Sequence, residues 1–388
     1  MIMKNRTSSK NGSKNIFHQL HLYFGLLFGI IFLIICITGM LLTFEKELTP
    51  LIWKKEQQVE VQSARLTLDV ISIKAKAIFP DKRLFRIEVP SDPSRSLRIQ
   101  YGSKKEKYWY AYLNPYTGEV LSKGQQNTRF FQKVLDIHRF LLMDKIGATI
   151  TGISAIVALL LSISGLYLWW PKNKHILKQR LKIKMSASTK RKVWDFHAVG
   201  GFYAAFFLFI FTLTGLTWSF NWYNEQFFKL FGTSKAEKEK VKNIETRIPT
   251  EFSPLHVIYK HINTLYPQPG NILITFPEND NLAISVTKES FAGSLLRINQ
   301  AYFDSKSGLM IKNNPMNSLP MAEQMRKMIK PIHIGSVFGL PSKIIMFLAV
   351  TLAASLPITG VWIWLNKRNK KKSSTVKIKK KSLQIPSM

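Results

Sequence analysis

Hydrophobic residues are concentrated in four long stretches that contain no charged side chain. The stretches cover Ile16–Phe44, Ile146–Trp170, Phe196–Asn224 and Ile344–Asn366, and they are 29, 25, 29 and 23 residues long. An α-helix needs about 20 mostly apolar residues to cross the hydrocarbon core of a bilayer. Each stretch therefore predicts a membrane-spanning helix, and the pattern excludes an ordinary water-soluble protein.

The two long segments between the spans show shorter patterns. Each contains an amphipathic helical stretch, Leu68–Ile78 in the first and Leu255–Leu265 in the second. Residues then alternate between apolar and polar, which predicts strands. The strands are expected at Leu84–Val89, Ser96–Tyr101, Tyr108–Leu113, Ile272–Phe276, Leu282–Val286 and Leu296–Phe303. Turns are predicted at Asn114–Gly118 and Asp304–Gly308, so each segment is expected to form a small α+β domain.

The four spans repeat one another in pairs. The first and third share a histidine followed by glycine, threonine and phenylalanine at offsets of 4, 17 and 23 residues, counted from His21 and from His197. The second and fourth share offsets of 26, 27 and 31 residues from His138 and His333 to Ser/Thr, Gly and Trp. The pattern predicts an α+β integral membrane protein in which two tandem copies of span, outer domain and span build a four-helix bundle.

Charge predicts how the chain is oriented. It has 56 Lys and Arg against 23 Asp and Glu, for a formal charge of +33. The short segments 1–16, 171–196 and 366–388 hold 22 basic residues and one acid, Asp195. Short basic segments stay in the cytoplasm. Because basic residues crowd the segments beside the spans, the charge is interpreted as a topology signal with lipid contact, and nucleic-acid binding is excluded.

The predicted organisation has nine parts. Tryptophans at the span ends, among them Trp169 and Trp364, are interpreted as interfacial residues. The N-terminus, the basic loop and the tail are cytoplasmic, and the two α+β domains face outward. The parts are residues 1–16, span 17–44, outer domain 45–137, histidine segment and span 138–170, loop 171–196, span 197–220, outer domain 221–332, histidine segment and span 333–366, and tail 367–388.

Four of the eight histidines are matched across the repeat: His21 with His197 near the inner face, and His138 with His333 near the outer face. Two imidazoles that face each other inside a helix bundle suit a six-coordinate haem iron. These four side chains are therefore candidate axial ligands of two haem groups. The alternative interpretation of a histidine at a span end is an interfacial residue.

Other residues near the histidines have candidate roles. Gly25 and Gly201 stand one turn beyond His21 and His197, where a missing side chain would let a porphyrin lie close to the helix. They could instead be small-residue helix contacts. Arg139 could meet haem propionates at the outer face, or be an ordinary interfacial cation, as could Lys330. His18 shares the face of His21 and is a rival ligand, although Trp194 stands at the corresponding position of the third span.

Several chemistries find no support in the sequence. Cys36 is the single cysteine, which excludes an internal disulfide, a cysteine cluster and the Cys-x-x-Cys-His attachment of haem c. No phosphate-binding loop or dinucleotide fingerprint is evident. Electrons, if they flow, must come from a separate donor.

The histidine elements resemble the PepSY-associated transmembrane proteins. The similarity lies in His21-x3-Gly25 with Thr38-Gly39, in Asp136-Ile-His138-Arg139, in Ser164-Gly165-Leu-Tyr-Leu-Trp169, and in outer elements such as Phe79-Pro80. The resemblance implies a bacterial inner-membrane protein with PepSY-like periplasmic domains. Some relatives are di-haem reductases that release iron from ferric siderophores. It also assigns axial-ligand roles to the four matched histidines, although His333 lacks the arginine that follows His138.

The predicted function is therefore electron transfer across the inner membrane. Two haem b groups would carry electrons from a cytoplasmic or membrane donor to a periplasmic ferric chelate. The alternative is a non-redox membrane protein whose PepSY modules bind or inhibit a periplasmic peptidase or other partner. A permease is a third interpretation, which the absence of charged residues within the spans disfavours.

Overall fold

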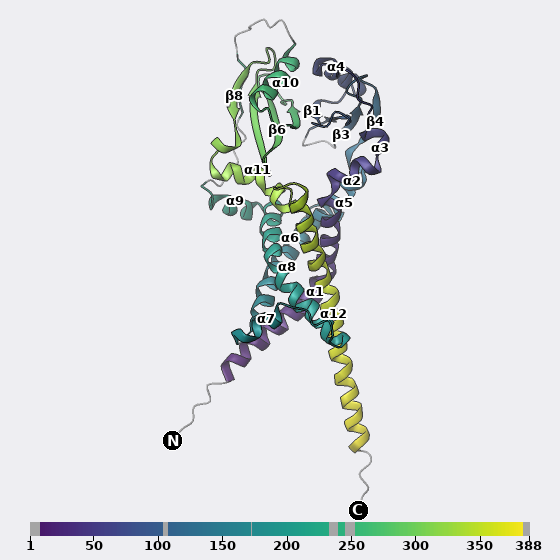
Figure 1. Cartoon of the computed structure of the whole chain (residues 1–388), viewed down its shortest axis with the longest axis vertical. Helices are drawn as coiled ribbons and strands as arrows, with labels where there is room; N and C mark the ends of the chain where they lie inside the picture. Colours follow the sequence, from purple (N-terminus) through teal and green to yellow (C-terminus); the bar gives the residue numbers. More distant parts are fainter. Residues whose placement is uncertain (1–7, 104–107, 172, 233–239, 245–252, 383–388) are drawn as a thin grey trace, which may run out of the picture. The chain divides into compact units, whose positions relative to one another are not determined.

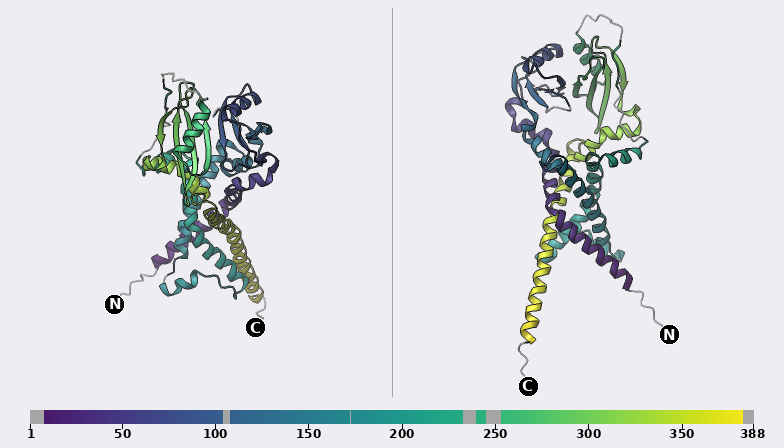
Figure 2. Two further views of the ribbon diagram at one scale, coloured as in Figure 1. Left: turned by 45° about the horizontal axis from the view of Figure 1, so that its top comes forward. Right: turned by 180° about the vertical axis from the view of Figure 1, so that it is seen from behind.

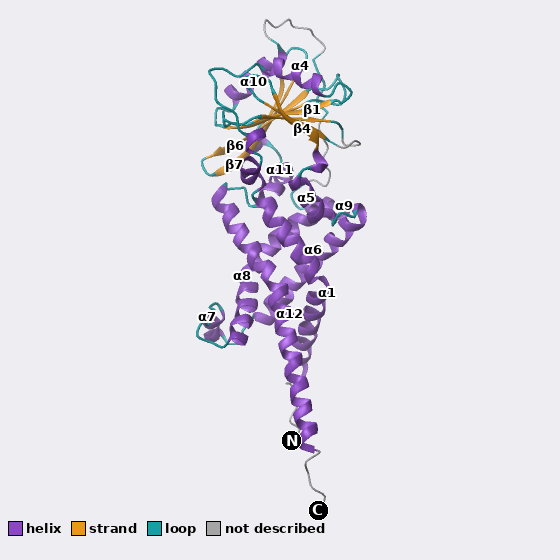
Figure 3. Ribbon diagram, turned by 90° about the vertical axis from the view of Figure 1, so that its right-hand side faces the viewer, coloured by secondary structure: helices purple, strands orange, loops and turns teal. Residues whose placement is uncertain are grey.

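The computed structural model describes residues 8–103, 108–171, 173–232, 240–244 and 253–382. It divides into two compact units. Unit 1 comprises residues 1–40, 136–221 and 344–388, and unit 2 comprises residues 41–135 and 222–343. Figure 3 distinguishes them by secondary structure, since the strands belong to unit 2 and unit 1 is helical.

Four long helices build unit 1 (Figure 1). They are α1 (Ser8–Thr43), α6 (Asp144–Trp169), α8 (Thr189–Ser219) and α12 (Leu340–Ser382). The short α7 (Leu177–Arg180) lies between α6 and α8. Among the described residues, four helical segments are long and apolar enough to cross a membrane: Lys14–Thr43, Asp144–Trp169, Thr189–Ser219 and Leu340–Arg368. They coincide with the four predicted stretches, so the prediction of four helices long and apolar enough to cross a membrane is confirmed.

Small side chains bring these helices together. Ala204 on α8 and Ala353 on α12 are almost fully buried in one cluster with Cys36 on α1. Small residues allow close approach of helices inside a membrane. Large apolar side chains such as Leu27 and Ile30 are instead exposed on the outside of α1, as expected of a lipid-facing surface. In the views of Figure 2, α1 and α12 cross and then diverge toward their termini.

Unit 2 contains one antiparallel sheet of eight strands in the order β4-β3-β2-β1-β5-β6-β7-β8. The strands are β1 (Leu84–Val89), β2 (Leu97–Tyr101), β3 (Trp109–Leu113), β4 (Val120–Gln125), β5 (Gly270–Thr275), β6 (Ile284–Ala292), β7 (Leu295–Phe303) and β8 (Met310–Asn314). The predicted strands coincide closely with β1, β2, β3, β5 and β7, whereas β6 extends to Ala292, beyond the predicted Leu282–Val286, and β4 and β8 were not predicted. The pairing of β1 with β5, which joins the two halves into one sheet, was not predicted.

Side-chain alternation places one row of apolar residues across this sheet. Neighbouring strands pair in register, with Ile87 opposite both Ile99 and Ile274. The row continues to both sides and is completely buried: Ala111, Ile99, Ile87, Ile274, Val286 and Ala301. Helices α4 (Leu68–Ile78) and α10 (Pro254–Leu265) cover this face through residues such as Ile71 and Ile258. The two halves therefore share a single hydrophobic core.

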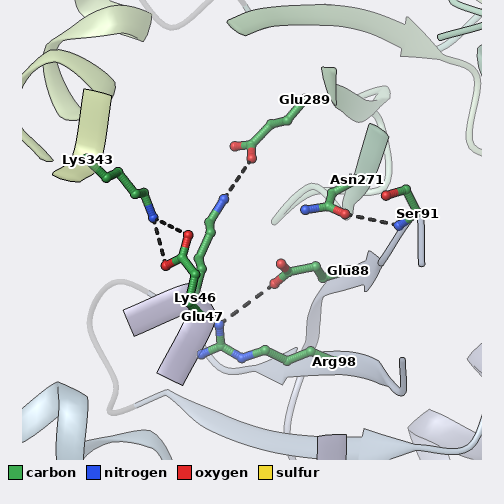
Figure 4. A network of polar contacts seen from close by, with 8 residues as sticks. All are labelled: Lys46, Glu47, Glu88, Ser91, Arg98, Asn271, Glu289 and Lys343. Carbon is green, nitrogen blue, oxygen red and sulfur yellow. Dashed lines mark hydrogen bonds and ion pairs between the residues drawn. The ribbon is translucent and has the colours of Figure 1, made fainter. Parts of the chain in front are cut away.

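Polar contacts also connect the two halves of unit 2. The carboxylate of Asp69 on α4 accepts hydrogen bonds from the backbone amides of Leu255 and His256, at 3.2 and 2.9 Å. These amides lie at the start of α10, where the helix dipole favours a negative charge. The side chain of Asn271 accepts a hydrogen bond from the amide of Ser91 at 3.0 Å (Figure 4). Because each contact joins residues about 180 positions apart, it fixes one half against the other.

Two ion pairs lie near the contact between Asn271 and Ser91 (Figure 4). Lys343 lies 2.8 Å from Glu47, and Lys46 lies 3.2 Å from Glu289 (Figure 4). The Lys343 side chain is only 5% exposed, whereas that of Lys46 is 63% exposed. A buried ammonium depends on its carboxylate partner far more than an exposed one does.

The remaining helices are short. They are α2 (Glu45–Ile52), α3 (Lys54–Gln57), α5 (Phe130–Phe140), α9 (Asn221–Lys229) and α11 (Met321–Ile334). The two predicted turns are confirmed, because Gly118 and Gly308 have φ of 73° and 75°. Their amides donate to the carbonyls of Asn114 and Asp304, each at 2.9 Å. Glycine adopts this left-handed backbone without steric cost.

Candidate functional site

Unit 1 contains a partly open cavity lined by α1, α6, α8 and α12. Its volume is about 440 Å³, within the usual range for small-molecule and cofactor sites. The walls are mostly apolar and include Phe28, Phe32 and Leu208. Both His21 and His197 line the cavity, and so do Gly25 and Gly201. The four residues that the sequence predicts for the inner site therefore surround one space.

His21 on α1 and His197 on α8 face each other across this space. Their ring centroids are 6.3 Å apart, and the ring planes are nearly perpendicular, at 88°. A metal–imidazole bond is about 2 Å long, so two imidazoles on opposite sides of one metal ion have centroids roughly 6 Å apart. The observed separation therefore suits two axial ligands of one metal centre. His18 also lines the cavity, but this ring relationship is made by His21.

Each imidazole is held by a hydroxyl on a neighbouring helix. Nδ1 of His21 lies 2.9 Å from Oγ of Ser164 on α6, and Nδ1 of His197 lies 2.9 Å from Oγ1 of Thr359 on α12. The Ser164 hydroxyl donates to the carbonyl of Leu161, and the Thr359 hydroxyl donates to the carbonyl of Ser355. Each hydroxyl oxygen then accepts a hydrogen from Nδ1. This network assigns the tautomer that keeps a lone pair on Nε2, the form that binds metals.

A glycine follows each of these hydroxyl residues and makes room for the ring. A Cβ on Gly165 would lie 3.3 Å from Cε1 of His21, and a Cβ on Gly360 would lie 3.3 Å from Cε1 of His197. Both distances are tighter than an ordinary van der Waals contact. The pairs Ser164-Gly165 and Thr359-Gly360 thus form a seat for each histidine. Sequence spacing identified these pairs as repeated, but their contact with the histidines was not predicted.

Gly25 and Gly201 leave open space in the cavity. A Cβ on Gly25 would meet no atom within 4 Å, and one on Gly201 would meet only Leu356, at 3.6 Å. Because both positions line the cavity, a side chain there would occupy volume that the glycine leaves free. Their placement fits a flat group lying against α1 and α8, as the sequence predicts.

His138 on α5 has the same kind of seat. Its Nδ1 lies 3.0 Å from the hydroxyl of Thr38 and 3.0 Å from the carbonyl oxygen of Ile35. A carbonyl only accepts hydrogen bonds, so Nδ1 carries the hydrogen and Nε2 keeps the lone pair. A Cβ on Gly39 would lie 3.2 Å from Cε1 of His138. His138 therefore rests on a Thr-Gly pair, as His197 does, and as His21 rests on a Ser-Gly pair.

His333 and Arg139 are the remaining residues predicted for the outer site. His333 lies in α11 and belongs to unit 2, whereas His138 belongs to unit 1. Their pairing stays a prediction. The Arg139 guanidinium lies 4.9 Å from the centre of the Phe140 ring, and its role toward a propionate also stays a prediction. Gly335, two residues after His333, has φ of 73° and ends α11, which gives it a structural reason to be glycine.

The donor set agrees with a metal bound inside a macrocycle. Across the described part of the chain, no group of three or more His, Cys, Asp or Glu side chains could hold a bare metal ion. A porphyrin supplies four nitrogen ligands of its own, so two imidazoles complete its coordination. The pair His21 and His197 supplies the two imidazoles that such a macrocycle would need.

The model of the PepSY-associated TM region matches residues 18–367. The chain belongs to this family. The match spans all four predicted membrane helices and both segments of unit 2, so it supports the membrane assignment. Comparison with curated proteins finds no matching relative.

Proposed function

We propose that this PepSY-associated membrane protein is a di-haem electron-transfer protein of the bacterial inner membrane. In this proposal it reduces a ferric siderophore, or another ferric chelate, on the periplasmic side. The observation that carries the proposal is the pair His21 and His197, with centroids 6.3 Å apart and both Nδ1 atoms engaged.

The chain's own residues have defined tasks in this proposal. His21 and His197 would hold one haem b through Nε2, and His138 and His333 would hold a second. Bound haem supplies a one-electron carrier whose potential depends on its axial ligands and burial. Ser164 and Thr359 keep the imidazole tautomers fixed. The apolar walls formed by Phe28 and Phe32 exclude water from the centre.

The reaction balances with an external donor. A reduced cofactor or quinol on the cytoplasmic side or in the membrane gives up one electron, and one Fe(III) in the chelate becomes Fe(II). Hard oxygen chelators hold Fe(II) less tightly, so the metal is released. Net positive charge on the two outer segments favours an anionic chelate. The basic loop and tail support a topology with both termini in the cytoplasm.

Visible spectroscopy of the purified full-length protein tests the proposal. Protein from haem-replete cells should show the low-spin bands of two b-type haems per chain after dithionite, quantified as the pyridine haemochrome. His21→Ala or His197→Ala should remove one haem, and His138→Ala or His333→Ala the other. His175→Ala is the matched control, because this exposed histidine lies outside the cavity. A colourless protein would contradict the proposal and favour the partner-binding alternative.

Activity can then be measured directly. Protein in proteoliposomes with a reduced donor inside should generate external Fe(II) from a ferric chelate, followed with an Fe(II)-specific chromophore. The four histidine variants should lose this activity, whereas the His175→Ala protein should retain it. Equal rates in all five variants would exclude the haem route.

A further inference from the structure

The cavity between α1, α6, α8 and α12 has one polar end. Its wall on α6 runs from Ser154 to Trp169, a rise of roughly 22 Å. Beside Trp169 the lining residues become polar or amphipathic: His18, Arg180, Trp194, Trp364 and Lys367. Toward Ser154 the lining is dominated by residues such as Phe32 and Leu208. A ligand of this cavity must therefore be apolar at one end and polar at the other.

Trp169 carries an unsatisfied donor at the polar end. Its side chain is buried, with 6% exposed, and its ring stacks on Phe202 with centroids 4.0 Å apart. Within the described structure, its Nε1–H has no hydrogen-bond partner. A buried indole N–H usually finds an acceptor, and leaving one unpaired costs stability. Because Trp169 lines the cavity, a bound ligand with an acceptor oxygen would meet this need.

Arg180 supplies positive charge next to the indole. The guanidinium donates a hydrogen bond through Nη1 to the carbonyl of Trp169, the last residue of α6. This contact fixes the cation at the helix end, where the dipole also favours it. A guanidinium has five N–H donors in a planar fork that matches a carboxylate. One bond to Trp169 therefore leaves donors that can serve a ligand.

The charged side chains that line the cavity are all cations. Lys367 on α12 adds a second cation, and the described lining contains no Asp or Glu. The nearest acid in sequence is Asp195, which is buried and accepts hydrogen bonds from Arg191 and the amide of Lys184. It therefore does not compensate Arg180. Two cations and a neutral donor at one end select a ligand with carboxylate groups there.

We infer that Arg180, Lys367 and the indole N–H of Trp169 bind the propionate carboxylates of the haem held by His21 and His197. This assignment rests on the proposed function, since it takes haem as the occupant. The apolar lining would accommodate the macrocycle, and the three donors would hold its carboxylates at the polar end. Arg139, which the sequence offers as a possible propionate partner at the outer face, does not line this cavity.

Haem retention with and without free carboxylates tests the assignment. Full-length protein in nanodiscs is reconstituted with haem b or with its dimethyl ester, and transfer to excess apomyoglobin is followed at the Soret band. Arg180→Gln should speed loss of haem b about tenfold or more. Trp169→Phe, which keeps the stacked ring, should speed it about fivefold. The dimethyl ester should leave the unmodified protein quickly, and neither substitution should accelerate that loss further.

Two substitutions outside the cavity lining serve as controls. Arg368→Gln removes a cation that lies over the Trp364 ring but does not itself line the cavity. Trp170→Phe alters an exposed tryptophan that also lies outside the lining. Both should retain haem b normally. Unchanged loss in Arg180→Gln and Trp169→Phe, or equal acceleration for haem b and its ester, would overturn the assignment while leaving the proposed function intact. If the unmodified protein takes up no haem, the proposed function fails as well. It also fails if a variant that lacks both His21 and His197 retains the same haem content.

Discussion

The hydroxyl oxygen of Ser164 lies 2.9 Å from Nδ1 of His21 and joins α6 to α1. Thr359 has the same relationship to His197, with Thr38 and His138 as a third example. Groups that hydrogen-bond to a ligating histidine commonly affect metal affinity by 10- to 100-fold. The hydroxyls are therefore expected to tune the site without contacting the metal.

Replacing Ser164 by alanine should weaken haem retention about tenfold, because Nδ1 of His21 loses its acceptor. The midpoint potential of that haem should rise, since the imidazole becomes a weaker electron donor. Ser162→Ala is the control, because Ser162 also lines the cavity but its hydroxyl donates to the carbonyl of Ala158 in its own helix. Identical potentials and retention for both variants would refute the role of Ser164.

Adding a single methyl group beneath a histidine should disturb the site. Gly165→Ala places Cβ 3.3 Å from Cε1 of His21, so the ring must shift by a few tenths of an ångström. We expect weakened low-spin bands and a partial high-spin signal in the visible and EPR spectra. Gly200→Ala is the matched control, since its Cβ would meet Leu352 at an ordinary 3.9 Å. A fully low-spin Gly165→Ala protein would show that the seat tolerates the extra methyl.

Glu47 should be important for the stability of unit 2. Glu47→Gln leaves the Lys343 ammonium buried without its carboxylate, and we expect a loss of about 1–2 kcal/mol of unfolding free energy. Lys46→Gln removes the exposed pair with Glu289 and should cost less than about 1 kcal/mol. Denaturant unfolding followed by circular dichroism measures both. Equal losses would mean that burial of Lys343 does not govern the effect.

Asp304 should make unit 2 sensitive to acid. Burial alone would raise the pKa of Asp304, but hydrogen bonds from Ser307, Ile244 and Lys306 outweigh it and hold the pKa below its ordinary 3.8. The folded state then binds fewer protons than the unfolded state, so the contribution of Asp304 is present above about pH 4 and lost as pH falls toward the lowered value.

Thermal unfolding between pH 3 and pH 6 checks this expectation. Asp304→Asn should lower the melting temperature at pH 6 and reduce its fall below pH 4. Asp280→Asn is the control, because Asp280 is exposed. The first half of the sheet has a neutral residue, Asn114, in the equivalent turn, where its side chain accepts the amide of Tyr116 at 2.9 Å. A melting curve unaffected by Asp304→Asn would contradict the assignment.

Local structure could be predicted well from the sequence. The ends predicted for the helix Leu68–Ile78 and the strand Leu84–Val89 agree with the structure, because hydrophobic periodicity reports directly on which side chains are buried. The join between β1 and β5 could not be predicted. Backbone hydrogen bonds between strand edges carry no side-chain signature, and the paired residues Ile87 and Ile274 are far apart in sequence.

The histidines that line the candidate site could be identified from the sequence, but the groups that hold them could not. Exact offsets within the repeat single out His21 and His197, and the structure brings these rings together. Ser164 and Thr359 share the repeat, yet their contacts cross from one helix to another and leave no trace in local spacing. Trp169 was interpreted as an interfacial residue, whereas its ring is buried against Phe202. Arg180 was interpreted only as part of a topology signal.

The pairing of β1 with β5 also affects how the chain is made. Strand β1 has its edge unpaired until β5 has been synthesised, about 185 residues later. At ordinary translation rates this interval lasts roughly 10 to 40 s, and an exposed strand edge invites aggregation. Both strands must also reach the same side of the membrane before they can pair. The chain between β1 and β5 must therefore cross a bilayer an even number of times, a condition that two spanning helices, α6 and α8, would meet.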